Sequence, residues 1–168
     1  MSAVRSEFSP RGGGAPAMRV MTVGQLDAVL AIEVQAYPFP WTRGNFIDSI
    51  ASGYLARTLF AGDGELIGYF VAMPGFEEMH LLNLTVASRH EGLGHARRLL
   101  AELYALSASF AATALWLEVR ESNARARALY AREGFTEAGR RRDYYPAPAG
   151  QREDAILMTR TLVREGAR

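Results

Sequence analysis

The chain has 168 residues, among them 19 arginines, 18 acidic residues, no lysine and no cysteine. The lack of cysteine excludes a disulfide framework, a thiolate zinc site, an iron–sulfur cluster and a cysteine nucleophile. The length indicates one domain, and 49% hydrophobic with 22% charged residues is typical of a soluble globular protein. A net charge of +1 argues against nucleic-acid binding by charge alone.

From residue 18 onward, the hydrophobic periodicity alternates between helix and strand. Apolar residues at helical spacing, with the capping residues Thr42 and Gly134, predict helices at about 24–36, 42–52, 94–107 and 123–133. Apolar runs bounded by turn residues predict strands at about 19–22, 54–60, 65–74, 78–86, 114–119, 135–142 and 153–161. The order β-α-α-β-β-β-α-β-α-β-β indicates an α/β domain built on one mixed sheet.

The two ends of the chain carry no such pattern. We expect a flexible N-terminal tail over 1–17, a domain over 18–162 and a short C-terminal tail over 163–168. Charged residues in the first tail interrupt the apolar stretch that a secretory signal needs. Residues 99–117 carry Glu102 as their sole charge, but their many Ala and Ser residues make a poor membrane span. We therefore expect a cytoplasmic protein that does not enter a membrane.

A glycine-containing turn, RHEGLGH at 89–95, follows one predicted strand and opens a predicted helix. Glycines allow a tight turn that exposes successive N–H groups, and a helix N-terminus adds positive partial charge, so phosphate oxygens are favoured here. A lone G-x-G is by itself typical of an ordinary strand-to-helix turn. The turn lacks the third glycine of a dinucleotide fingerprint and the Gly-Lys-Ser/Thr of a P-loop. What remains is a pyrophosphate cradle of another kind, R-x-x-G-x-G.

This pattern resembles the acetyl-coenzyme A signature of the GNAT family of N-acetyltransferases. A second block typical of the family contains LWLEVR (115–120), SN (122–123), ALY (128–130) and GF (134–135). Its continuation through RRDYYP (141–146) and EDA (153–155) resembles the RimI type, whose members acetylate the N-terminal alanine of a small-subunit ribosomal protein. The resemblance covers nearly all of residues 18–162.

The resemblance implies a single mixed, mostly antiparallel, twisted sheet of about seven strands flanked by about four helices. It also implies acetyl-coenzyme A as co-substrate and the N-terminus of a protein or peptide, such as a ribosomal protein, as partner. Neither a nucleic acid nor a membrane is expected as a partner.

The same resemblance assigns the coenzyme site. Backbone groups of the strand before the turn would contact the pantetheine arm and the thioester carbonyl, at Leu84, Thr85 and Val86, whose side chains alone indicate only a buried strand. A backbone N–H aimed at the thioester oxygen would stabilise the developing oxyanion. The turn would hold the pyrophosphate through Arg89, His90, Glu91, Gly92, Leu93, Gly94 and His95. Glu91 departs from the family, because an acid stands where a basic or neutral residue is common.

Glu118 interrupts the apolar run 115–119 within a predicted interior strand. If it points to the same side as Trp116, its carboxylate lies near a cleft, where desolvation would raise its pKa toward neutrality. The reaction needs a base, because an α-amine with a pKa of about 8 is mostly protonated at neutral pH. The alternative is a buried structural glutamate paired with an arginine such as Arg120 or Arg142. The RimI resemblance favours the base, acting directly or through one water.

Tyr130, near the end of the predicted 123–133 helix, would by default be a core residue. The family pattern ALY-x-x-x-GF instead favours a general acid that returns a proton to the departing thiolate. Asn123 would by default be an N-cap, and the resemblance adds a hydrogen bond to the pantetheine arm. The two roles of Asn123 can coexist.

Two aromatic loops are candidates for the acceptor site. One is YPFPW at 37–41, and the other contains the tyrosine pair of 142–146. Either loop could merely cover the core, but together they resemble the peptide-binding loops of the RimI type. The residues predicted to bind the acceptor are Tyr37, Phe39, Trp41, Tyr144 and Tyr145.

His80, His90 and His95 form no ligand set, so we expect no metal. Without a cysteine for an acetyl-enzyme, direct attack on the thioester in a ternary complex is the expected route. Two rivals keep the coenzyme site: a small amine, polyamine or lysine side chain as acceptor, and a coenzyme-binding regulatory module without catalysis. A third rival is a structural protein that binds a partner without chemistry.

The charge is unevenly distributed along the chain. Residues 1–88 carry five arginines and eight acidic residues, a net −3, whereas residues 89–168 carry fourteen and ten, a net +4. The basic half suits an anionic coenzyme. In the acidic half, Glu77 and Glu78 could draw in a basic peptide.

Overall fold

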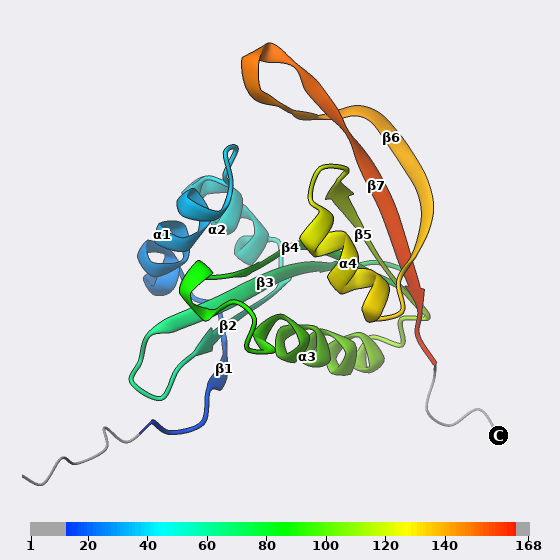
Figure 1. The fold of residues 1–168 in the computed structure, drawn as a ribbon. Coiled ribbons are helices and arrows are strands. Elements are labelled where there is room, and N and C mark those ends of the chain that lie inside the picture. The colour runs from blue at the N-terminus through cyan, green and yellow to red at the C-terminus, as the bar shows by residue number, and fades with distance from the viewer. Residues whose placement is uncertain (1–12, 164–168) are drawn as a thin grey trace, which may run out of the picture.

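In a computed structural model, which describes residues 13–163, seven strands form one sheet in the order β1-β2-β3-β4-β5-β7-β6 (Figure 1). The strands are β1 (Ala17–Val20), β2 (Leu55–Phe60), β3 (Leu66–Pro74), β4 (Glu78–Val86), β5 (Ala114–Arg120), β6 (Thr136–Pro146) and β7 (Arg152–Thr161). All neighbouring strands are antiparallel except β4 and β5. The predicted order of elements and the single mixed sheet are confirmed.

Four α-helices cover the sheet: α1 (Leu26–Ala36), α2 (Arg43–Ala51), α3 (His95–Ser109) and α4 (Ala124–Arg132). Figure 1 shows α1 and α2 grouped apart from α3 and α4. Two buried clusters explain the grouping, one formed by α1 and α2 against β2 and β3, the other by α3 and α4 against β3, β4, β5 and β7. The central strand β3 is therefore buried on both faces over residues 66–72.

The element bounds differ from the predicted ones mainly at the ends. The first strand begins at Ala17, which the sequence placed in the tail, while residues 1–12 and 164–168 lie outside the described part. β6 continues to Pro146 instead of ending at 142, so both tyrosines predicted in a loop are strand residues. Asn123 is the N-cap of α4, as predicted, because its Oδ1 accepts a hydrogen bond from the backbone N–H of Ala126 at 3.2 Å.

β4 and β5 diverge, and this divergence makes room for a site. They pair only from Glu78 to Leu81, opposite Ala114 to Leu117. Leu82 is an extra residue in the β3–β4 ladder, a β-bulge that bends β4 where it leaves β5. β5 continues along β7 while β4 continues along β3, so the ends of β4 and β5 stand apart.

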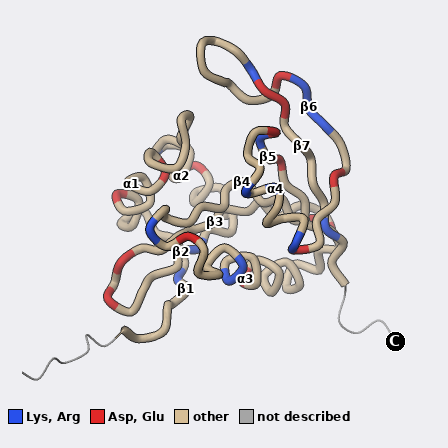
Figure 2. The backbone as a smooth tube through the Cα atoms, viewed as in Figure 1, with Lys and Arg blue, Asp and Glu red and all other residues tan. Residues whose placement is uncertain are grey.

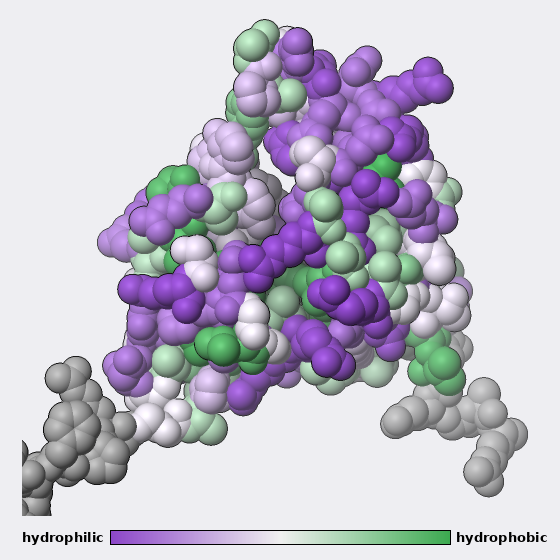
Figure 3. All heavy atoms as spheres, in the orientation of Figure 1, coloured by the Kyte–Doolittle hydropathy of each residue, from purple (hydrophilic) through white to green (hydrophobic). Residues whose placement is uncertain are grey.

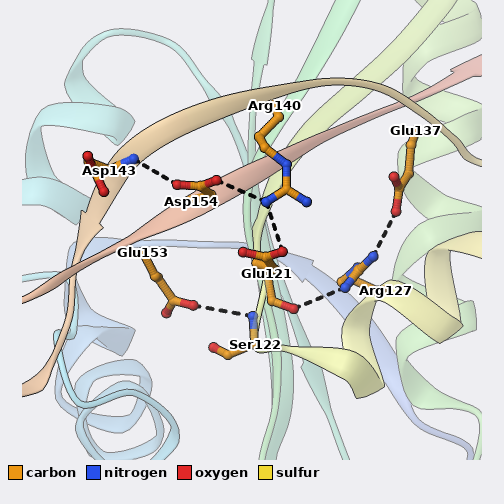
Figure 4. A network of polar contacts seen from close by, with 8 residues as sticks. All are labelled: Glu121, Ser122, Arg127, Glu137, Arg140, Asp143, Glu153 and Asp154. Atoms are coloured by element: carbon orange, nitrogen blue, oxygen red, sulfur yellow. Dashed lines mark hydrogen bonds and ion pairs between the residues drawn. The ribbon is translucent and has the colours of Figure 1, made fainter.

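β6 and β7 form a long hairpin that extends beyond the rest of the sheet (Figure 1). Along it, arginines and acidic residues are interleaved (Figure 2). Figure 4 shows how they pair at the base of the hairpin: Arg140 donates to Glu121 at 2.8 Å and to Asp154 at 2.9 Å, and Asp154 also accepts the backbone N–H of Asp143. Arg127 of α4 donates a hydrogen bond to Glu137 of β6 at 2.8 Å, which connects α4 to the same hairpin. Two residues of the arginine run 140–142 are thus engaged within the fold, Arg140 here and Arg141 in an ion pair with Glu118.

Candidate active site

A cleft of about 470 Å³ opens where β4, the turn after it, α3 and α4 meet. Figure 3 shows apolar side chains recessed among hydrophilic ones in the middle of this face. Nine residues predicted to bind the coenzyme line it: Leu84, Thr85, Val86, His90, Glu91, Gly92, Gly94, His95 and Asn123. Residues from the predicted strand, turn and helix therefore meet at one cavity.

The turn has the geometry of an anion cradle. Gly92 and Gly94 have φ angles of 76° and 84°, in the left-handed region that favours glycine. Apart from the glycine itself and its two chain neighbours, no atom of the described residues lies within 4 Å of where a Cβ would stand at either position. Gly94 is the N-cap of α3, and no side chain in residues 13–163 caps that helix end, so its first N–H groups face the cleft without a partner. This arrangement fits a phosphate group.

Two of the predicted coenzyme residues belong to the turn but do not line the cleft. Arg89 forms an ion pair with Glu65 of the β2–β3 turn, and Glu65 also lies 3.6 Å from the ring of His90. Leu93 is 68% exposed. Neither residue is among those that line the cleft.

Arg125 is a cleft residue that the sequence reasoning missed. It is the second residue of α4, and its guanidinium forms an ion pair with Glu91 of the turn. Both residues line the cleft, so the pair bridges its two sides. The unusual acid at position 91 is therefore neutralised by an arginine from the opposite wall. The helical spacing of Arg125 with Leu129 and Arg132, which also line the cleft, could have indicated it.

Tyr130 and Tyr37 both line the cleft. Tyr130 is the buried residue of α4, and its hydroxyl forms no hydrogen bond with the described residues, so it is available to a ligand. Burial raises its pKa, which keeps the phenol protonated as a general acid requires. Tyr37 was predicted to contact the acceptor, but its hydroxyl instead lies 2.8 Å from Thr85 Oγ1 and donates to the Leu84 carbonyl at 3.2 Å. Burial raises the pKa of Tyr37 to about 12.

Glu118 lies on the same face of β5 as Trp116 and points away from the core residues on either side of it, so the condition stated from the sequence is met. Its side chain is 10% exposed, and its carboxylate lies 2.9 Å from Nε of Arg141. A hydrogen bond with this carboxylate raises the pKa of the Tyr144 hydroxyl. The ion-pair partner is thus Arg141 and neither of the arginines proposed from the sequence. Glu118 does not line the 470 Å³ cleft.

The two aromatic segments predicted for the acceptor meet at Arg120. Its guanidinium lies 4.5 Å from the ring centre of Tyr145 and 5.5 Å from that of Phe39. It also donates to the Pro146 carbonyl at 2.7 Å and to Glu153 at 2.8 Å. Arg120 is two residues beyond the predicted base, so both aromatic segments stand beside that carboxylate.

The remaining aromatic residues divide by exposure. Phe39 and Tyr144 are exposed enough to contact an acceptor. Trp41 packs on Phe46 of α2, with ring centres 5.2 Å apart, and is half-buried against the α1–α2 core. The reading of Trp41 as a residue that covers the core therefore describes its contacts best.

His80 lies near the predicted base, a position for which the sequence offered no signal beyond the absence of a metal-ligand set. Its ring stacks on Trp116, with centres 3.6 Å apart, because β4 and β5 pair in this register. Burial lowers the pKa of His80, so the ring is neutral at neutral pH. In residues 13–163, no group of three or more His, Asp or Glu side chains is arranged to hold a metal ion.

Glu77 and Glu78 stand at the opposite end of β4 from the cleft. Eight residues separate Glu78 from Val86, which is about 26 Å along a strand. Glu78 is paired with Ala114, so it lies about four residues, or roughly 13 Å, from Glu118. Exposed charges at that distance are largely screened at physiological salt, so steering of a peptide by this pair would be weak.

No helix among the described residues is long and apolar enough to cross a membrane. This agrees with reading residues 99–117 as α3, a turn and the first half of β5.

Known proteins with the same arrangement were found by sequence and by structure. The chain is 38% identical over 133 residues to the ribosomal protein bS18-alanine N-acetyltransferase of Escherichia coli strain K12, covering 79% of this chain and 88% of that protein. It is 36% identical over 127 residues to the enzyme of the same name from Haemophilus influenzae, covering 76% and 86%. The crystal structure of the ribosomal-protein-S18-alanine N-acetyltransferase from Escherichia coli superposes with a TM-score of 0.82 at 34% identity, covering 91% and 97%. The sequence model of the acetyltransferase (GNAT) family matches residues 26–135, and with these identities the chain belongs to that family.

Proposed function

We propose that this protein transfers the acetyl group of acetyl-coenzyme A to the N-terminal amine of a protein, in particular the N-terminal alanine of a small-subunit ribosomal protein. One observation carries the proposal: the diverging ends of β4 and β5 separate the cleft that contains Tyr130 and the glycine turn from a carboxylate, Glu118, flanked by aromatic walls. The names of the relatives at 36–38% identity support this acceptor. A ribosomal-protein acceptor would place the reaction in the cytoplasm.

The coenzyme would lie along the cleft. Backbone N–H groups of the 92–95 turn and the start of α3 would hold the pyrophosphate. Asn123 and the backbone of Leu84–Val86 would hold the pantetheine arm, which places the thioester in the gap between β4 and β5. Gly68 of β3 permits this placement, because a Cβ there would stand 2.5 Å from the Thr85 carbonyl oxygen and displace β4.

The acceptor amine would enter from the other side of the gap, between Phe39 and Tyr145. Glu118 would accept a proton from the ammonium group, because the amine attacks only when neutral. The amine nitrogen forms a bond to the acetyl carbon, a backbone N–H of β4 stabilises the negative charge on the oxygen, and the carbon–sulfur bond breaks. The hydroxyl of Tyr130 would give its proton to the departing thiolate, and the second proton lost by the amine nitrogen would pass through solvent to restore the phenol.

Mass spectrometry of a ribosomal-protein peptide beginning with alanine, incubated with the protein and acetyl-coenzyme A, tests the proposal. We expect one acetyl group on the α-amine and none on lysine side chains or on free polyamines. Acetylation of only lysine side chains or polyamines would contradict the proposed acceptor and support the rival acceptor. Coenzyme binding without release of free thiol in the presence of any of these acceptors would support the non-catalytic rival.

Two variants test the assigned roles. Glu118→Gln and Tyr130→Phe should each keep coenzyme affinity within a few-fold while lowering turnover by roughly 10²–10⁴. Matched controls are Glu121→Gln, an exposed glutamate three residues along, and Tyr104→Phe, whose hydroxyl bonds Glu133 away from the cleft. Wild-type turnover in both test variants would contradict the assignment.

A further inference from the structure

Glu33 of α1 is a buried carboxylate that no step above uses. Its side chain is 1% exposed, and no arginine or histidine among residues 13–163 forms an ion pair with it. Removing a charged group from water is costly unless hydrogen bonds replace the lost hydration. The hydrogen bonds of Glu33 must therefore compensate for the loss of hydration, and they connect the segments that donate them.

Three different segments donate to this carboxylate. The backbone N–H of Trp41 donates to Oε1 at 3.0 Å, and the Tyr69 hydroxyl of β3 donates to Oε2. The side-chain amide of Asn83 on β4 contacts both oxygens, at 3.3 and 3.2 Å. Glu33 thereby joins α1, the loop that follows it, and two central strands.

The network continues from Asn83 into the coenzyme cleft. Thr85 Oγ1 donates to Asn83 Oδ1 at 2.8 Å. The hydroxyl oxygens of Tyr37 and Thr85 lie 2.8 Å apart, within hydrogen-bond distance, and either hydroxyl can be the donor. Both Thr85 and Tyr37 line the cleft. A buried carboxylate is thus connected, through two side chains, to the strand that would hold the thioester.

The loop from Tyr37 to Trp41 is held at both ends by this network. Tyr37 is fixed to Thr85 and Trp41 is fixed to Glu33, while Phe39 between them lies over the guanidinium of Arg120. On the strand side, the bulge at Leu82 turns Asn83 toward α1 at the point where β4 leaves β5. The aromatic wall and the bend in β4 therefore share one anchor.

We propose that Glu33 is a positioning residue that fixes the 37–41 loop relative to the Asn83–Thr85 segment of β4. This fixed geometry would hold the acceptor amine within attacking distance of the thioester carbon. This inference rests on the proposed function. Glu33 touches neither substrate. Its effect is on geometry, and a misplacement of about 1 Å can reduce a rate by roughly 10²-fold.

Two substitutions of Glu33 remove its hydrogen bonds to different extents, and their effects on kcat/KM can be compared. Glu33→Gln keeps one acceptor oxygen, whereas Glu33→Leu removes every hydrogen bond at similar volume. We expect kcat/KM for the peptide to fall in the order wild type, Gln, Leu, by roughly tenfold and then about a hundredfold, with coenzyme affinity within about threefold. Calorimetry with coenzyme A measures the affinity. Because Glu33→Leu can fail to fold, the Gln variant alone is sufficient to decide.

Tyr69→Phe is the matched control. It removes one hydrogen bond from the same carboxylate but leaves the contacts to Trp41 and Asn83 in place. If Glu33 positions the two segments, Tyr69→Phe lowers the melting temperature at least as much as Glu33→Gln while keeping kcat/KM within about threefold. Loss of activity in proportion to loss of stability in both variants would overturn the proposal, and so would unchanged kcat/KM in Glu33→Gln.

A spectroscopic readout separates this inference from the proposed function. The chain has two tryptophans, and a Trp116→Phe background, used only for fluorescence, leaves half-buried Trp41 as the reporter. Glu33→Gln should shift its emission to longer wavelength, and Tyr69→Phe should not. If the wild-type protein acetylates no peptide, the proposed function fails, yet this shift still reports whether Glu33 places the loop. Unchanged emission would overturn the inference even in an active enzyme.

Discussion

The carboxylate of Glu118 lies 2.9 Å from Nε of Arg141, although the two residues come from strands that are not neighbours in the sheet. β7 lies between β5 and β6, and Arg141 reaches across it because its partner in the ladder is the small residue Ala155. The proposed base is therefore an ion-paired carboxylate on the face that carries Trp116 and Arg120.

This pair predicts unequal effects of its two members. Glu118→Gln removes the proton acceptor and should lower kcat by roughly 10²–10⁴, whereas Arg141→Gln keeps a hydrogen-bond donor beside the carboxylate and should lower kcat by about tenfold. Single-turnover rates measured at saturating coenzyme would show the difference. Arg142→Gln is the matched control for charge. An Arg141→Gln variant as inactive as Glu118→Gln would mean that the ion pair itself is required for turnover.

The ion pair between Glu91 and Arg125 predicts a gain of affinity on removal of an acid. In the free protein Arg125 is bound to Glu91, so Glu91→Gln frees a cation in the cleft and should tighten coenzyme binding about three- to tenfold at low salt. Arg125→Gln should weaken it by a similar factor. Calorimetric titration with coenzyme A measures both constants.

A second exposed pair between α4 and a neighbouring segment provides the control. Arg127 contacts Glu137 at 2.8 Å and lines no part of this cleft, so Glu137→Gln and Arg127→Gln make the same charge changes elsewhere. They should leave coenzyme affinity within about twofold. Glu91→Gln can also be made in the Arg125→Gln background. If it tightens coenzyme binding there by the same factor, the gain comes from removing repulsion between Glu91 and phosphate. Release of Arg125 from its ion pair would then not be the cause.

His80 predicts a loss of stability toward mildly acidic pH. Burial lowers its pKa in the folded protein, whereas in the unfolded chain the imidazole titrates near its ordinary value of about 6.5. Between the two pKa values the unfolded chain binds more protons, so this contribution to the unfolding free energy decreases as pH falls below about 6.5. Urea unfolding at pH 7.5 and 5.5 should show a smaller decrease in His80→Gln than in wild type. Equal decreases would assign the pH dependence to other groups.

Asp154 predicts that the β6–β7 hairpin loosens in acid. Hydrogen bonds from Arg140 and from the backbone N–H of Asp143 lower the pKa of Asp154. The ionised form is therefore favoured by folding, and its contribution, present above the unfolded pKa of about 3.9, is lost as pH falls through the lower folded value. Limited proteolysis by pepsin at pH 2 and pH 4 should cut residues 143–152 faster at the lower pH. In Asp154→Asn the segment should be cut at similar rates at both values.

The order of elements, the glycine turn before α3 and the N-cap at Asn123 followed from the sequence alone, because helical and strand periodicity and glycine conformations depend on neighbours a few residues apart. For Glu118 the sequence left the orientation conditional, and the structure places its side chain on the same face of β5 as Trp116. The tertiary structure decided which arginine pairs with Glu118, that Tyr37 turns into the coenzyme cleft, that Arg125 bridges to Glu91, and that Glu33 anchors the 37–41 loop. These contacts join residues far apart in the chain, and they depend on the bulge at Leu82 and on the short β4–β5 pairing, neither of which leaves a local pattern in the sequence.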